Sequence, residues 1–309
     1  MLGSGKQGDV HGALATSDMR NAPPFGQTMD PAERGEPVGL TDEQLARYLE
    51  HGWVAPIDVM SEAEAGELLV ALEHAEAEHP DDLHPEHRNN AHLAFPFLAD
   101  VVTDPRVVDC AEQIIGPDIS LWSTVLFIKD PSSAGYVSWH QDAHYMGLQP
   151  DRFVTAWLAL SPSTVESGCV SVIPGSHRTR STHIDRYGDD NILTRGQEID
   201  GVEVSTAVHL KLRPGQMSLH HPWIVHGSQP NRSTSRRVGL AMQSFLAADV
   251  RPVRGEHHVA SIRGATPDVA FETVSLPTKL DDAGRAVRAA ANTALSSVLY
   301  DGADEVRHL

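Results

Sequence analysis

Short β-type segments separated by turn residues fill the chain from residue 119 onward and limit its fold more than any other feature. Each segment is rich in apolar and β-branched residues, and Pro, Gly, Ser or Asn residues bound it. Because no helical pattern separates them, these segments predict a β-sandwich or a jelly-roll barrel. The predicted strands are 119–129, 153–161, 169–173, 208–212, 216–219 and 238–246.

Helical signals flank the predicted strands. Two of the helix starts are capping boxes, in which a Ser or Thr and a Gln or Glu three residues later satisfy each other's free backbone N–H groups. Asp caps the other two starts, once just before a Pro. We therefore expect a mostly β protein with flanking α-helices. The predicted helix starts are Thr41, Ser61, Asp104 and Asp281.

The length of 309 residues suits one barrel domain with its flanking helices. Residues 1–37 are rich in Gly, Pro, Asp and Ser and lack a periodic apolar pattern, so a flexible tail is predicted there. A single domain is predicted over 38–309. Its expected parts are a helical region at 38–117, the jelly-roll core at 118–250 and a C-terminal segment with a helix at 251–309.

Composition excludes several classes of partner. A formal net charge of −18 argues against nucleic acid, because binding to phosphate backbones depends on clustered Lys and Arg. No apolar run approaches the roughly 18 residues of a membrane helix, and no secretory signal is evident. Cys110 and Cys169 provide no disulfide framework, which suits a reducing compartment. We expect a soluble, cytoplasmic protein that binds neither nucleic acid nor membrane and acts on a small molecule.

His140 and Asp142 are the first candidate metal ligands. On an extended strand, residues i and i+2 project from the same face, so an imidazole and a carboxylate would point into one volume. A second histidine, His226, follows a later apolar segment. Two histidines and one carboxylate can hold Fe(II) from one side and leave the other side open. His220 and His221 are weaker candidates, because neither precedes a Gly-Ser pair.

Six motifs occur in order between about residues 40 and 275. They are Phe127–Pro131, Trp139–Asp142, Thr155–Leu160, Gly168–Cys169 with Ile173–His177, Leu212–Gly215, and His226–Ser233 leading to Arg236. Together they resemble the phytanoyl-CoA dioxygenase family of Fe(II)/2-oxoglutarate oxygenases, especially its bacterial small-molecule branch. The resemblance implies a double-stranded β-helix core, also called a jelly-roll or cupin-like core. It also implies that His140, Asp142 and His226 bind the iron.

The resemblance further implies a 2-oxoglutarate site. The family binds the co-substrate through an Arg on the strand after the distal histidine, helped by a Ser that corresponds to Ser228. Arg236 is our first choice for this Arg and Arg237 is the alternative. Adjacent strand residues face opposite ways, so only one of the two can enter the barrel. Trp157 resembles the tryptophan that packs near the co-substrate, whereas Lys129 is interpreted as a solvated strand end.

The expected activity is that of a 2-oxoglutarate-dependent dioxygenase. Such an enzyme uses Fe(II), 2-oxoglutarate and O2 to hydroxylate, or otherwise oxidise, an unactivated C–H bond of a small molecule, and it releases succinate and CO2. Asp142 fills the position where related halogenases have Ala or Gly, which favours hydroxylation, desaturation or ring closure over halogenation. No Lys/Arg cluster suits the phosphates of coenzyme A, so a CoA thioester is disfavoured.

The substrate side is predicted from loops. His144 continues the i+2 series from Asp142, and Asn90 lies in a polar loop, so both are candidate substrate contacts. The polar insert at 178–205 is too long for a plain connection and indicates a lid or an entrance loop. A non-catalytic jelly-roll module that binds metal and 2-oxoglutarate, or senses them, is the main alternative. A cupin-like isomerase or hydrolase is disfavoured, because it has no use for the His-Gly-Ser…Arg segment.

Overall fold

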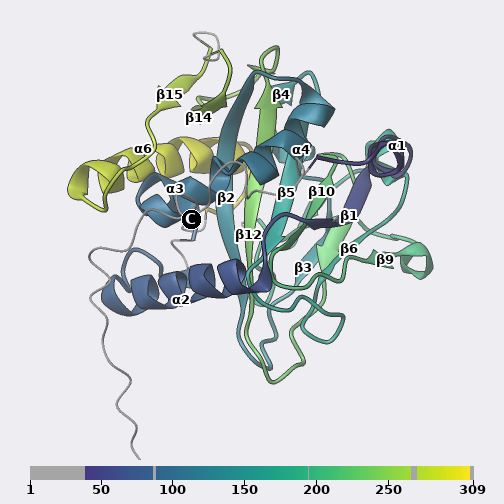
Figure 1. Ribbon diagram of the computed structural model, residues 1–309. Helices are drawn as coiled ribbons and strands as arrows, with labels where there is room; N and C mark the ends of the chain where they lie inside the picture. Colours follow the sequence, from purple (N-terminus) through teal and green to yellow (C-terminus); the bar gives the residue numbers. More distant parts are fainter. Residues whose placement is uncertain (1–38, 86–87, 194, 266–269, 307–309) are drawn as a thin grey trace, which may run out of the picture.

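Two antiparallel sheets form the centre of the molecule (Figure 1). The computed structural model describes residues 39–85, 88–193, 195–265 and 270–306, so the predicted tail at 1–37 lies outside the described residues. The larger sheet has the order β1-β10-β5-β12-β2-β14-β15, and only its last pair is parallel. Its strands are β1 (Trp53–Asp58), β10 (Gln216–His220), β5 (Phe153–Ala159), β12 (Arg237–Ala247), β2 (Ile119–Lys129), β14 (His258–Arg263) and β15 (Glu272–Val274).

The smaller sheet has four strands in the order β3-β11-β6-β9, and two short antiparallel strand pairs accompany it. Within it, His140 and His226 lie directly opposite each other on neighbouring strands. The short pairs are β13 with β4 and β7 with β8. These strands are β3 (Val137–His140), β11 (His226–Ser228), β6 (Val170–Val172), β9 (Val208–His209), β13 (Arg251–Pro252), β4 (Leu148–Gln149), β7 (Ile184–Asp185) and β8 (Gln197–Glu198).

Helices surround the larger sheet, as Figure 1 shows. Both predicted capping boxes are present, and Asp104 and Asp281 each cap a helix with their side chains. The helices are α1 (Asp42–His51), α2 (Glu62–Glu78), α3 (Pro96–Val102), α4 (Pro105–Ile115), α5 (Ala143–Met146) and α6 (Asp282–Leu299). The described part of the chain also contains three 3₁₀ turns: η3 (Ala91–Leu93), η4 (Ser176–Arg178) and η5 (Val204–Thr206).

The larger sheet is buried on both faces. Leu158, Leu240 and Met242 belong to the apolar core that the sheet shares with the helices. Trp157 and Ala241, which alternate with them, belong to a second core that includes β6 of the smaller sheet. Side chains alternate between the two faces of a strand, so one face packs on helices and the other on the smaller sheet. Any polar residue on this second, inner face is therefore enclosed.

This architecture confirms the predicted fold class, a jelly-roll core with flanking helices. The predicted strand 119–129 matches β2 at both ends, and 238–246 falls within β12. Strand β1 was missed, because it lies among helical signals and contains Pro56, a residue that disfavours strands. It forms the edge of the sheet beside β10.

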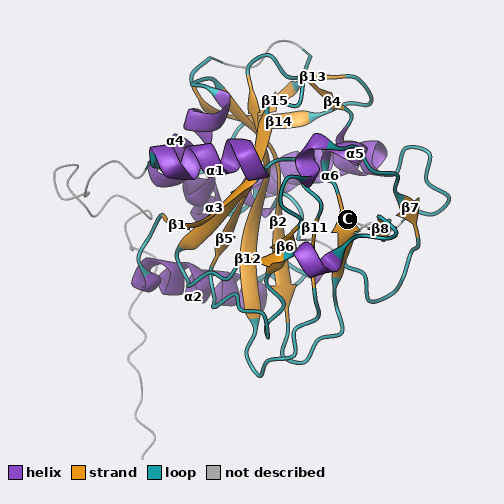
Figure 2. Ribbon diagram, turned by 90° about the vertical axis from the view of Figure 1, so that its right-hand side faces the viewer, coloured by secondary structure: helices purple, strands orange, loops and turns teal. Residues whose placement is uncertain are grey.

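The predicted insert at 178–205 folds into the β7-β8 pair and η5. Figure 2 shows β7 and β8 on the same side of the molecule as α5 and α6. Arg195 joins the insert to the end of α6 by donating hydrogen bonds to the carbonyl oxygens of Leu299 and Asp301, each at 3.1 Å. The insert is therefore held against the barrel at this side.

Candidate metal and co-substrate site

Three predicted metal ligands converge between the two sheets. The Asp142 Oδ1 atom lies 3.1 Å from Nε2 of His140 and 3.8 Å from Nε2 of His226. The ring centroids of the two histidines are 4.1 Å apart. The three ligand atoms all lie within 4.8 Å of one another, so they can hold one ion.

The reason for this convergence differs from the one that the sequence suggested. Strand β3 ends at His140, and Asp142 adopts helical backbone angles at the start of α5. The carboxylate thus reaches the imidazole through a turn, and not along an extended strand. Gln141 anchors this turn, because its buried side-chain amide donates to the carbonyl oxygens of Thr179 at 2.7 Å and Trp223 at 2.6 Å.

Hydrogen bonds orient both imidazoles toward the common volume. The Nδ1 atom of His140 lies 2.9 Å from the Ser138 carbonyl oxygen, and that of His226 lies 3.1 Å from the Ile224 carbonyl oxygen. An N–H at each Nδ1 donates to the carbonyl, which leaves the Nε2 lone pair for a metal.

The charge states also suit a cation. Burial lowers the pKa of His226 to about 3, so its ring is neutral. Burial acts to raise the pKa of Asp142, but the adjacent imidazoles of His226 and His140 hold it below its usual range. Two imidazoles and one carboxylate form the donor set of non-haem Fe(II) sites, so these residues fit iron.

Two buried cations lie on the inner face of the larger sheet, near the metal ligands. Lys129 on β2 and Arg237 on β12 are directly opposite in the register, and each is 1% exposed. Like charges in this position repel each other. Burial, followed by the charge of Arg237, lowers the pKa of Lys129 to about 6. Burial also lowers the pKa of Arg237, to about 10. The pair is therefore suited to a bound anion.

The contacts of these cations leave room for such an anion. Lys129 Nζ donates to Ser228 Oγ at 2.7 Å. The Arg237 guanidinium lies 5.1 Å from the centre of the Trp157 ring, and its Nε and Nη1 have no hydrogen-bond partner within the described residues. A cavity beside them is lined by Thr155, Trp157, Ser228, Arg237, His220 and the three candidate metal ligands. The predicted residues Ser228 and Trp157 are thus brought to this cavity.

The order of preference between the two arginines was wrong. Arg236 faces the outside of the barrel, where it forms ion pairs with Glu76 at 2.7 Å and Asp130 at 3.1 Å. Arg237, the alternative, points inward. The prediction that Lys129 is solvated was also wrong, because the strand end at which it lies is covered by the turn after β11, and Asn231 there donates to the Lys129 carbonyl. The signal that could have identified Arg237 and Lys129 as site residues is a polar side chain at a strand position that faces the interior of the barrel.

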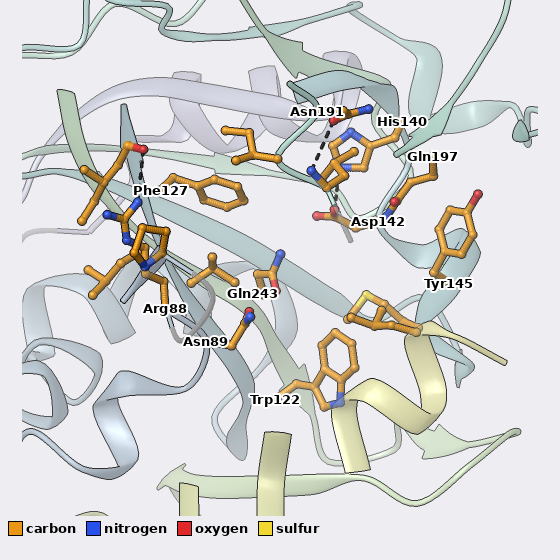
Figure 3. Close-up of a pocket in the computed structure, with 18 residues that line it drawn as sticks. Arg88, Asn89, Trp122, Phe127, His140, Asp142, Tyr145, Asn191, Gln197 and Gln243 are labelled. Atoms are coloured by element: carbon orange, nitrogen blue, oxygen red, sulfur yellow. Dashed lines mark hydrogen bonds and ion pairs between the residues drawn. The ribbon is translucent and has the colours of Figure 1, made fainter. Parts of the chain in front are cut away.

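A larger pocket opens on the other side of His140 and Asp142. Its volume is about 280 Å³, near the lower end of the range for small-molecule sites. Figure 3 shows Asn89 and Gln243 between Arg88 at one end and the ligands His140 and Asp142 at the other. Asn191, Ile192, Leu193 and Gln197 of the insert also line it, so the insert is part of the pocket wall, as a lid or an entrance loop would be.

The two predicted substrate contacts lie elsewhere. His144 is exposed and stacks on His183, with 4.1 Å between the ring centroids. Asn90 is 2% exposed and is bonded to Asn292 at 2.9 Å and to the Thr124 backbone N–H at 3.2 Å. Their chain neighbours Tyr145 and Asn89 line the pocket in their place. In both cases, therefore, the predicted residue is the immediate chain neighbour of a residue that lines the pocket.

Comparison with known proteins identifies the family. The profile of the family described as Phytanoyl-CoA dioxygenase (PhyH) matches residues 48–239, more than half of the chain. The chain belongs to the phytanoyl-CoA dioxygenase family. Iron and 2-oxoglutarate are the metal and co-substrate of this family, which confirms the predicted cofactors at that level.

Several relatives share the family. A probable alpha-ketoglutarate-dependent hypophosphite dioxygenase of Stutzerimonas stutzeri is 29% identical over 54% of this chain and 58% of its own length. The human peroxisomal phytanoyl-CoA dioxygenase is 32% identical over 48% of this chain and 45% of its own length. These matches thus span about half of each relative. A methylphosphonate hydroxylase of Gimesia maris is 26% identical over 69% of this chain and 84% of its own length.

Solved structures of other proteins share the fold. The non-heme monooxygenase ThoJ is 27% identical, with a TM-score of 0.74 over 83% of this chain and 97% of its own. CytC3 with Fe(II) and alpha-ketoglutarate, at 19% identity, shares the fold with a TM-score of 0.59 over 77% of this chain and 94% of its own.

Within the described residues, no helix is long and apolar enough to cross a membrane.

Proposed function

We propose that this protein is an Fe(II)/2-oxoglutarate-dependent dioxygenase that hydroxylates an unactivated C–H bond of a small molecule. One observation carries the proposal: the candidate ligands His140, Asp142 and His226 share a cavity with the buried guanidinium of Arg237. Lys129 reaches this cavity through Ser228, to which it is bonded. A metal site joined to an anion site in this way is what 2-oxoglutarate, a dicarboxylate, requires.

The residues of the chain have separate tasks in this proposal. His140, Asp142 and His226 hold the metal. When bound, iron with 2-oxoglutarate and O2 supplies the oxidising chemistry that breaks the C–H bond. The Arg237 guanidinium and the Lys129 amine bind the distal carboxylate of 2-oxoglutarate, because cationic donors make the strongest hydrogen bonds to carboxylates. The apolar walls around Trp157 exclude water from the reacting groups.

Asp142 favours hydroxylation, or a related oxidation, over halogenation. Its carboxylate occupies the position that a halogenase leaves free, and its low pKa keeps it ionised. Desaturation or ring closure would use the same ligand set. The proposal selects hydroxylation because a relative named as a methylphosphonate hydroxylase is 26% identical to this chain over 84% of its own length.

The pocket supports a small, polar substrate. Asn89 and Gln243 offer carboxamide groups near its centre, and Arg88 lies at its far end. Apolar residues such as Trp122 and Met146 form other parts of its wall. Arg88 is the one Lys or Arg among its described lining residues, so the phosphates of coenzyme A lack a matching cluster.

A non-catalytic module that binds metal and 2-oxoglutarate is the second candidate, since the same residues would serve it. The two proposals differ in turnover. Protein incubated anaerobically with Fe(II) and 2-oxoglutarate should develop a weak visible charge-transfer band in either case. On admission of air, the dioxygenase releases succinate and the binding module does not.

Asp142→Ala tests the proposed ligand set. We expect the variant to lose iron-dependent succinate release, because one of three metal ligands is removed. Asp130→Ala is the matched control, since Asp130 is an exposed carboxylate that pairs with Arg236 outside the barrel. Undiminished succinate release by the Asp142 variant, with iron and 2-oxoglutarate present, would refute the assignment.

A further inference from the structure

His220 is a buried histidine that the proposed ligand set does not use. It lies on β10, is 2% exposed, and neither of its ring nitrogens has a hydrogen-bond partner within the described residues. A buried polar atom without a partner destabilises a fold by roughly 1–3 kcal/mol. Because such atoms are rare in proteins, the two ring nitrogens of His220 indicate that a bound molecule supplies a partner.

The position of His220 indicates where that partner lies. Its ring centroid is 4.8 Å from that of His226, and its Nε2 is 3.9 Å from Asp142 Oδ2. The second distance is too long for a hydrogen bond. The three-ligand group comprises His140, Asp142 and His226, so His220 stands beside the metal ligands and faces the space next to them.

The register of the larger sheet extends this argument. His220 is paired with Thr155 on β5, and Ser218 with Trp157. Two residues along a strand span roughly 7 Å. The Arg237 guanidinium lies over the Trp157 ring, at one end of the cavity. Thr155, the partner of His220, is two residues from Trp157 on the same face of β5, so His220 lies one such step away from Arg237, beside the candidate metal ligands. His220, Thr155, Trp157 and Arg237 line one cavity.

We propose that His220 is a co-substrate contact: a ring N–H of this histidine donates a hydrogen bond to the 2-oxo acid end of bound 2-oxoglutarate. The inference rests on the proposed function and adds a third contact to it. Lys129 and Arg237 bind the distal carboxylate, and His220 orients the opposite end at the metal. One of the two unpartnered ring nitrogens of the free protein is thereby satisfied when the co-substrate binds.

Substitution of His220 tests this role without measuring turnover. His220→Phe removes both nitrogens and keeps an aromatic ring, whereas His220→Gln keeps an N–H donor. His221→Asn is the matched control on the same segment. The His221 Nδ1 atom accepts from the Trp223 backbone N–H at 3.1 Å, and an Asn oxygen can replace it. The measurements are calorimetric titrations of apo protein with Ni(II), and of Ni(II)-loaded protein with 2-oxoglutarate.

For His220→Phe, we expect a Kd for Ni(II) within about twofold of wild type. Its Kd for 2-oxoglutarate should rise about tenfold or more, as expected for a lost hydrogen bond to a charged group. His220→Gln should recover part of this loss, and His221→Asn should match wild type. The Tm of apo His220→Phe should rise by about 2–4 °C, because an unpaired polar ring is replaced by an apolar one.

Other outcomes contradict the inference in distinct ways. An unchanged Kd for 2-oxoglutarate in His220→Phe would show a packing role. A Kd for Ni(II) raised tenfold would show that His220 serves the metal and not the co-substrate. If His220→Phe does not fold, His220→Leu provides the same test, since it also lacks both nitrogens. Failure of the wild-type protein to bind 2-oxoglutarate would overturn the proposed function itself.

Discussion

At the scale of single residues, the inward face of β12 and β2 determines the chemistry of the site. Arg237 and Lys129 are neighbours across the two strands, and both side chains enter the barrel. Arg236, one position earlier, faces outward to Glu76. The strand periodicity of two thus separates the proposed co-substrate contact from a surface ion pair.

Substitution of the two arginines should give opposite results. Arg237→Met should raise the KM for 2-oxoglutarate about 10- to 100-fold, because it removes a charged hydrogen-bond donor from a dry cavity. Arg236→Met should leave this KM within about twofold and lower stability by about 1 kcal/mol or less, the usual range for a surface ion pair. Steady-state assays of succinate with varied 2-oxoglutarate measure both. A larger rise in this KM for Arg236→Met than for Arg237→Met would show that Arg236, our first choice from the sequence, binds the co-substrate.

Lys129 should make 2-oxoglutarate binding dependent on pH. Its pKa of about 6 means that the amine is largely neutral at pH 7 before the anion binds. A bound carboxylate stabilises the charged amine, so binding takes up a proton and affinity falls as pH rises above about 6. Two titratable groups act on the pKa of Lys129: Arg237 lowers it and Cys169 raises it.

We expect the Kd for 2-oxoglutarate to rise between pH 6.5 and 8.5, by at most about tenfold per pH unit. Titration calorimetry of Ni(II)-loaded protein measures it, and Lys129→Met should flatten the dependence. Protonation of metal-binding histidines would act in the opposite direction, weakening binding at low pH. A flat profile for the wild-type protein would contradict the role of Lys129.

At the scale of elements, the close contact between β12 and β5 shapes the co-substrate cavity. Gly239 on β12 leaves space for the Trp157 ring on β5, because a Cβ atom there would lie 2.0 Å from Trp157 Cζ2. The strands are fixed by their hydrogen bonds, so only a glycine allows the indole to lie across β12 beside Arg237.

Gly239→Ala should therefore displace the Trp157 ring. We expect the free energy of unfolding to fall by about 1–3 kcal/mol, as for other overpacked cores, and the affinity for 2-oxoglutarate to fall with it. Gly66→Ala in α2 is the control, because its Cβ would meet nothing within 4 Å, and it should stabilise the helix by up to about 1 kcal/mol. Urea unfolding and 2-oxoglutarate titration measure both. Equal changes in unfolding free energy and in 2-oxoglutarate affinity in the two variants would contradict the tight contact at Gly239.

At the scale of the whole molecule, the last helix supports the substrate pocket. Arg288 on α6 is buried and donates to the carbonyl oxygens of Asn89 at 2.9 Å and Asp82 at 2.7 Å. Asn292, one turn later, is bonded to Asn90. The loop that carries Asn89 into the pocket is thus held by a helix nearly 200 residues away along the chain.

Arg288→Met should loosen this loop. It leaves buried carbonyl oxygens without donors, so we expect a loss of about 1–3 kcal/mol in unfolding free energy. Faster backbone hydrogen exchange over residues 88–93 should accompany it, with Ni(II) affinity unchanged. Arg285→Met, on the same helix but paired at the surface with Asp82, should change neither by much. Unaltered exchange at 88–93 in Arg288→Met would exclude the support by α6.

Local features of the sequence determined the helix starts, most strands and the identity of the three metal-ligand candidates. Capping boxes such as Thr41 with Gln44 depend only on residues within one turn, so they can be recognised without tertiary contacts. The motif around His140 and Asp142 is equally local, because it spans only four consecutive residues. Strand β1 escaped prediction because its apolar pattern is short and interrupted by Pro56.

Only the tertiary structure decided which neighbouring residue faces the site. The choice of Arg237 over Arg236, of Asn89 over Asn90, and the burial of Lys129 depend on how distant strands and α6 pair with these segments. A shift of one residue reverses the face of every side chain on a strand, and the register is set by partners far along the chain. The enclosure of His220 beside the metal ligands has the same origin, since β10, β3 and β11 meet only in the folded barrel.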